Sequence, residues 1–169
     1  MKKIISVLSF LVLAVSLCAC GEKKPSVTPV TRGISFTAEV TYYNESCEVE
    51  VTVAKDGRTD MELISPDTIK GLTFHFEEGE VTAEYLGLEY KTDFKALPEG
   101  ACCIRLYEIL KDTFDEEISV AAEGENYCIL RNIGDGGYKL YLGGSGLPIS
   151  AEEPQGCFSA SFKNVKIEN

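Results

Sequence analysis

The sequence predicts a mainly β protein of the α+β class, in which a curved antiparallel sheet, an open half-barrel, wraps around one principal helix. Three observations predict this fold. Apolar and polar residues alternate with a period of two in many short segments, and turns rich in glycine or charge separate them. A helical period of three to four residues occurs in one stretch, between residues 98 and 114.

Residues 1–19 have the organisation of a secretory signal peptide. Lys2 and Lys3 give a positive start, an uncharged run extends from residue 4 to residue 19, and small Ala19 precedes Cys20. The sequence LCAC at 17–20 resembles the bacterial lipobox, whose cysteine becomes the lipidated first residue. We therefore expect an acyl chain such as palmitate on Cys20, which would hold the protein at the extracytoplasmic face of the cell membrane. An ordinary secreted protein whose signal peptide ends in cysteine is the alternative.

The charge excludes one class of partner. Residues 20–169 carry 14 basic and 27 acidic side chains, a net charge of −13. Because such a surface repels phosphates, we expect no nucleic-acid partner. Residues 20–32 contain two prolines and no apolar period, which predicts a flexible tether behind the lipidated cysteine. Residues 33–169 have the length of one domain.

The strands are predicted from alternation. In the first of them, Ile34, Phe36, Ala38, Val40 and Tyr42 share one face. The connections are short, so neighbouring strands are expected to be antiparallel. The alternating segments lie at 34–42, 47–53, 61–63, 72–76, 81–85, 118–122, 127–131, 138–142, 147–149 and 158–167, and residues 86–90 extend or restart the sheet.

The predicted helix is too small to cover the predicted sheet. About nine strands spaced about 4.8 Å apart make a sheet about 40 Å wide, whereas a helix of about 16 residues is about 24 Å long and about 10 Å across. The sheet must therefore curl around the helix, pack on itself, or leave an apolar concavity. The candidate lining residues of this concavity are Phe36, Val40, Val51, Leu63, Phe74, Phe76, Tyr85, Leu106, Leu110 and Leu140.

No group of residues predicts catalysis or metal binding. The single histidine, His75, alternates with two phenylalanines and is interpreted as a solvent-facing or locally hydrogen-bonded strand residue. Beyond Cys18 and Cys20, the thiols are Cys47, Cys102, Cys103, Cys128 and Cys157. Their scattered spacing predicts no zinc ligand cluster, so we expect no metal and no cofactor. Buried free thiols are favoured, with a Cys47–Cys157 or Cys128–Cys157 disulfide left open.

Several stretches resemble small clostridial-type lipoproteins of the LolA/LolB-like lipoprotein-carrier superfamily. They are MELISP at 61–66, IKGLTF at 69–74, GEVTAEYLG at 79–87, and the closing strands YKLYL at 138–142, GLPI at 146–149 and FSASFKNV at 158–165. The resemblance implies a curved sheet with a plug helix and an apolar interior that binds acyl chains or lipoproteins. One branch in spore-forming anaerobes supports germination through a protein partner. Shuttling between two membranes is not implied, because this chain is expected to stay anchored.

The sequence therefore favours a non-enzymatic, membrane-anchored lipoprotein whose apolar concavity binds a lipid-like ligand. The alternative is an interaction module that recruits or regulates a cell-envelope protein or a spore germination or cortex protein. An enzyme ranks last, because no nucleophile, base or metal site is recognisable.

Overall fold

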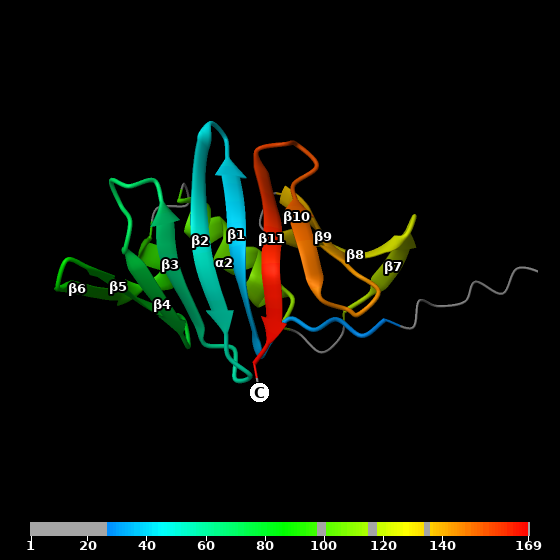
Figure 1. The fold of residues 1–169 in the computed structure, drawn as a ribbon, viewed down its shortest axis with the longest axis horizontal. Helices are drawn as coiled ribbons and strands as arrows, with labels where there is room; N and C mark the ends of the chain where they lie inside the picture. The colour runs from blue at the N-terminus through cyan, green and yellow to red at the C-terminus, as the bar shows by residue number, and fades with distance from the viewer. Residues whose placement is uncertain (1–26, 98–100, 115–117, 134–135, 169) are drawn as a thin grey trace, which may run out of the picture.

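The computed structural model describes residues 27–97, 101–114, 118–133 and 136–168 (Figure 1). Within these ranges, eleven strands form one antiparallel sheet in the order β6-β5-β4-β3-β2-β1-β11-β10-β9-β8-β7, and one α-helix packs against it. The mainly β class and the single principal helix are confirmed. The strands are β1 Ile34–Tyr42, β2 Glu45–Val53, β3 Thr59–Ser65, β4 Thr73–Glu77, β5 Glu80–Tyr85, β6 Leu88–Asp93, β7 Val120–Glu123, β8 Asn126–Ile133, β9 Gly136–Leu142, β10 Pro148–Glu152 and β11 Phe158–Ile167.

The first and last strands pair at the middle of the sheet. Ile34 of β1 lies opposite Ile167 of β11, and Tyr42 lies opposite Phe158. From this seam the strands β1 to β6 proceed outward on one side, and β11 back to β7 on the other, each joined to its neighbour in sequence by a short connection. The chain must therefore pass from one edge of the sheet, β6, to the opposite edge, β7.

The helix lies in this crossing segment. A short 3-10 helix, η1 Phe94–Ala96, follows β6, and α2 Cys102–Asp112 follows it; α2 lies behind the central strands in Figure 1. The predicted helical spacing is that of Cys103, Leu106, Tyr107, Leu110 and Phe114. The first four are buried, and Phe114, just past the end of the helix, is half-buried. Ile104 and Ile109 are buried as well, because the sheet surrounds more of the helix than one stripe of apolar residues would need.

The core lies between the helix and the concave face of the sheet. The rings of Phe76 on β4 and Tyr107 on α2 are stacked, with centroids 3.9 Å apart and an interplanar angle of 12°. Phe94 of η1 meets Tyr107 edge-on at 5.2 Å, and Phe36 lies 4.9 Å from Phe162 across the β1–β11 seam. Offset and edge-on aromatic pairs add to the energy of apolar burial.

Two turn residues with positive φ settle the ambiguous stretch at 86–90. Leu86 has φ +51° and Gly87 has φ +81°, so the chain reverses there and β6 returns along β5. A two-residue turn of this kind matches the twist of a β-hairpin. Residues 86–90 therefore restart the sheet, and with the ten other alternating segments they account for the eleven strands.

The N-terminal segment of the described chain is bound to the half of the sheet that contains β9 and β10. The Val30 amide donates to the carbonyl of Gly146, in the β9–β10 turn, at 2.9 Å, and the Thr31 hydroxyl donates to the carbonyl of Thr113 at 3.2 Å. A side chain at Gly146 would not fit, since an added Cβ would lie 2.1 Å from the carbonyl oxygen of Thr28. Glycine at this position lets the entering chain pass over the turn.

The predicted signal peptide and Cys20 lie outside the described residues. Among the helices that the structure describes, none combines the length and the apolar composition needed to cross a membrane.

Candidate functional site: an apolar surface on the concave face

An apolar surface extends beyond the helix on the outer strands β4, β5 and β6. The pairing places Phe74 opposite Ala83, Ala83 opposite Tyr90, and Tyr85 opposite Leu88. Opposed residues share a face of a sheet, and Phe74 is two residues from Phe76, which stacks on the helix. These five residues, Phe74, Ala83, Tyr85, Leu88 and Tyr90, therefore form one patch on the concave face, here named the β4–β6 apolar surface.

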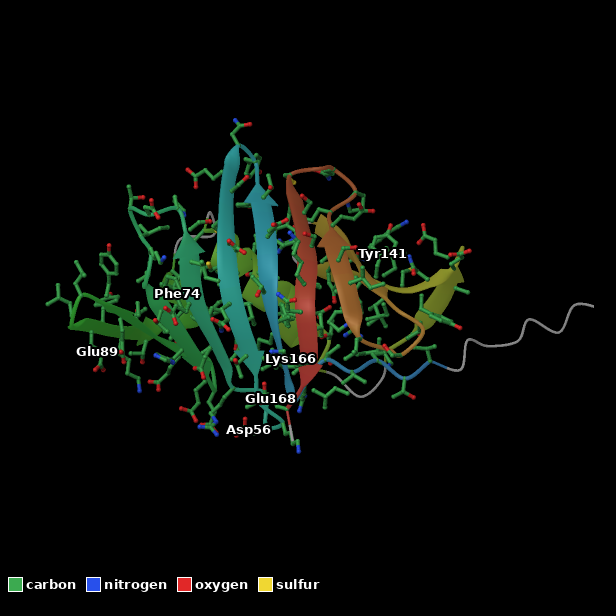
Figure 2. The ribbon with its side chains drawn as sticks, viewed as in Figure 1. Asp56, Phe74, Glu89, Tyr141, Lys166 and Glu168 are labelled. Carbon is green, nitrogen blue, oxygen red and sulfur yellow. The ribbon has the colours of Figure 1, made fainter. Side chains whose placement is uncertain are left out.

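This surface is progressively less covered toward the edge of the sheet. Phe76 is 1% exposed, Phe74 and Tyr85 are half-buried, and Leu88 and Tyr90 are 76% and 65% exposed. Figure 2 shows Phe74 nearer to the central strands and Glu89 of β6 at the outer end of this wing. The helix thus covers the middle of the concave face and leaves part of its apolar surface open to solvent.

The ten residues that the sequence suggested as the lining of an apolar concavity fall into two groups in the structure. Phe74 and Tyr85 lie on the β4–β6 apolar surface. The other eight are at most 3% exposed and belong to the core between the helix and the sheet. They are Phe36, Val40, Val51, Leu63, Phe76, Leu106, Leu110 and Leu140. A ligand could touch these eight only if α2 moved.

Leu88 and Tyr90 were not among the suggested residues. Part of the signal for them is present in the sequence: alternation continues through Leu88 and Tyr90, and Gly87 is a residue that can adopt the positive φ of a turn. Their place on the concave face depends on the register of the β5–β6 hairpin, which pairs Tyr85 with Leu88. A register shifted by one residue would turn both side chains to the convex face.

Polar contacts fix α2 to the C-terminal half of the sheet. Asp112, at the end of the helix, accepts hydrogen bonds from the Tyr138 hydroxyl at 2.8 Å and from Arg131 Nε at 3.1 Å. Arg105 forms an ion pair with Glu153, which follows β10. Toward β4, by contrast, the helix makes the aromatic contacts of Tyr107. The side of the helix next to the β4–β6 apolar surface is therefore held by apolar packing.

A cavity of about 340 Å³ lies at the C-terminal end of the helix, next to the β2–β3 and β4–β5 turns. Both charge signs and two aromatic rings line it. Its lining residues are Asp56, Gly57, Arg58, Glu77, Glu78, Gly79, Tyr107, Lys111 and Phe114. None of the ten suggested residues lines this cavity.

His75 lies on β4 with its ring 41% exposed. Its Nδ1 is 2.7 Å from a carboxylate oxygen of Asp60, which lies opposite on β3. The predicted role, a locally hydrogen-bonded strand residue, is confirmed.

The prediction that the thiols are scattered is wrong for three of them. The sulfur atoms of Cys47, Cys102 and Cys103 all lie within 4.8 Å of one another. Spacing could not reveal this, because the folding of the sheet brings Cys47 of β2 to the first turn of α2. Hydrogen bonds from Cys103 and Cys47 lower the pKa of the Cys102 thiol, and the same contacts with Cys102 raise the pKa of Cys47 and Cys103. All five cysteines among the described residues are free.

No family model and no curated protein matches the chain. Several solved structures do match the chain. An uncharacterized conserved protein from Thermus thermophilus has a TM-score of 0.54 at 13% identity, covering 83% of this chain and 81% of that one. The LolA superfamily protein NE2245 from Nitrosomonas europaea has a TM-score of 0.46 at 7% identity, covering 88% and 91%. LprF from Mycobacterium bovis has a TM-score of 0.36 at 14% identity, covering 82% and 90%. At 13% identity, the likeness to the Thermus thermophilus protein is one of fold.

Proposed function

We propose that this protein is a non-enzymatic lipoprotein, anchored through Cys20 to the extracytoplasmic face of the bacterial cell membrane, that binds an acyl-chain lipid on the β4–β6 apolar surface. One observation carries the proposal: the apolar concave face continues past the helix to Leu88 and Tyr90, which are largely exposed. Exposed contiguous apolar surface of this kind is typical of binding sites.

A lipid chain suits this surface better than a polar ligand. The patch offers two aromatic rings, a leucine and an alanine at its open end, and it continues inward to the half-buried ring of Phe74. Full burial of a leucine or phenylalanine side chain contributes about 1.5–3 kcal/mol. The resemblance to lipoprotein carriers and the expected membrane anchor point to the same class of ligand.

Native mass spectrometry of residues 21–169, purified without detergent from a bacterial host, tests the ligand. The whole described core lies within this range. We expect a co-purifying mass of a few hundred daltons that denaturation releases and that is identifiable as a lipid. A protein that carries no such mass and does not bind a fluorescent fatty acid in titration would contradict the proposal.

Two variants test the location. Leu88→Ser should weaken fatty-acid binding roughly tenfold, since it removes about 1.5 kcal/mol or more of apolar contact. Leu130→Ser is the matched control: Leu130 is 62% exposed on β8, and it alternates with buried Ile129, so it lies on the convex face. Equal effects of the two substitutions would move the site away from the β4–β6 apolar surface.

The anchor is tested separately. Cys20→Ala should release the protein from the membrane fraction, because the expected acyl chains would be lost. A Cys20→Ala variant that stays in the membrane fraction would contradict anchoring through this residue and would leave the ligand test unaffected.

A second function, recruitment of an envelope protein, is favoured by the open edge of the sheet. β6 is the last strand on its side, and five of its six residues are exposed. An edge strand presents unpaired backbone groups to which a partner strand can add. Crosslinking from β6 on intact cells would recover a stoichiometric protein partner in this case, and the partner would identify any role in germination.

A further inference from the structure

The three clustered thiols occupy the junction of β2 with the start of the helix. Cys47 is the third residue of β2, and Cys102 and Cys103 are the first two residues of α2. The Cys102 and Cys103 sulfurs are 3.9 Å apart, and all three sulfurs lie within 4.8 Å of one another. Among the described residues, this is the group of cysteine, histidine and acidic side chains that is close enough to share one ion.

These distances match those of a shared metal ion. Metal–thiolate bonds of about 2.3 Å place two sulfurs on one ion about 3.8–4.0 Å apart, in trigonal or tetrahedral geometry. The Cys102–Cys103 distance already has this value, and Cys47 would need to move by less than about 1 Å. A disulfide needs a much shorter S–S distance, and adjacent cysteines are poorly placed to form one.

The cluster is open to solvent on one side, and the start of the helix favours a thiolate at Cys102. Cys47 and Cys103 are 6% and 2% exposed, whereas Cys102 is half-buried, so an ion can reach the cluster from its Cys102 side. The N-cap residue, Ala101, has no side chain that could accept hydrogen bonds from the free backbone N–H groups of the first helical turn. Negative charge on Cys102 is stabilised by these groups and by the helix dipole.

We propose that Cys47, Cys102 and Cys103 form a binding site for one soft, thiophilic metal ion, such as Cu(I), held by three thiolates. Sulfur donors select soft ions, and a donor set of three sulfurs satisfies Cu(I) without a fourth ligand. On binding, the thiols that are still protonated release their protons to solvent, and no electron is transferred. The site is independent of the β4–β6 apolar surface and of lipid binding.

Anaerobic Cu(I) titration of the full chain in detergent tests the site. Cys18→Ser and Cys20→Ser in the parent protein remove the two thiols of the N-terminal segment. We expect the parent to retain one Cu(I) per chain against a colorimetric Cu(I) chelator, and X-ray absorption to show three sulfur neighbours at about 2.2–2.3 Å.

Single substitutions locate the ion. Cys102→Ser should lower Cu(I) affinity at least tenfold. Because Cys102 is half-buried, this variant is expected to fold, which the thermal unfolding of the metal-free protein verifies. Cys128→Ser and Cys157→Ser, at the other two free thiols, are the matched controls and should bind Cu(I) like the parent. A parent that yields all its Cu(I) to the chelator, or a folded Cys102→Ser variant that binds as the parent does, would overturn the proposal.

Discussion

Tyr138 is fully buried, yet its hydroxyl donates to the carboxylate of Asp112. This contact joins the end of the helix to β9. Tyr138→Phe should lower the free energy of unfolding by about 1–2 kcal/mol, since it removes a hydrogen bond to a charged group in a partly buried setting. Urea denaturation measures the change.

Tyr141 supplies the control for this prediction. It lies on the same strand, and its hydroxyl donates to Glu152 at 2.8 Å in a solvent-exposed bond. Tyr141→Phe should change stability by less than about 0.5 kcal/mol, because water replaces the lost partner. If the two substitutions cost the same, burial does not determine the strength of the Tyr138 contact.

The Arg105–Glu153 ion pair is a further polar attachment of the helix. The side chains are 13% and 9% exposed, and Arg105 also pairs with Glu108 at 2.8 Å. Glu153→Gln should lower the free energy of unfolding by about 2 kcal/mol. Only Glu108 would then balance the charge of the Arg105 guanidinium, which is largely removed from solvent. Glu39→Gln, which breaks the exposed pair with Lys163, should cost well under 1 kcal/mol. Similar melting curves for the two variants would contradict this.

At the scale of the element, the β5–β6 hairpin contains a residue type that its turn disfavours. Leu86 has φ +51° and a side chain that is 85% exposed. The left-handed conformation costs a leucine about 1 kcal/mol, whereas asparagine adopts it readily. Leu86→Asn should therefore raise the unfolding free energy by about 0.5–1 kcal/mol, measured by denaturant unfolding. A loss of stability would show that the leucine side chain makes contacts that outweigh the strain.

The hairpin also illustrates what sequence patterns can and cannot predict. Alternation identified the strands and which residues share a face within each strand, because that periodicity is a property of one segment. It could not decide that residues 86–87 form a turn, and so it missed Leu88 and Tyr90. The thiol cluster was missed for a related reason: Cys47 and Cys102 are far apart in sequence, and their contact depends on where the helix crosses the sheet.

For the whole molecule, the seam between β1 and β11 determines how the fold closes. It pairs residues more than a hundred positions apart, such as Ala38 with Phe162, whereas β1 and β2 form a local hairpin. Closing a long loop costs entropy before the contacts repay it, so we expect the seam to form after the transition state.

Folding kinetics test this order. Phe162→Ala should lower the free energy of unfolding by about 3 kcal/mol and act mainly by accelerating unfolding. Val51→Ala, in the local β1–β2 hairpin, should slow folding instead. Stopped-flow measurements over a range of denaturant separate the two effects. A Phe162→Ala variant that folds much more slowly would place the seam in the folding nucleus.

The N-terminal segment enters the fold beside the β9–β10 turn, on the half of the sheet opposite the β4–β6 apolar surface (Figure 1). Six residues lie between Cys20 and Val27, so the contour length from one to the other is at most about 25 Å. In a flat sheet, β6 would lie roughly 35 Å from that entry point. For a domain anchored at Cys20, the orientation of the sheet thus sets the height of the β4–β6 apolar surface above the membrane. A sheet parallel to the bilayer brings Leu88 and Tyr90 to the headgroups, and an upright sheet presents them to molecules well outside the membrane.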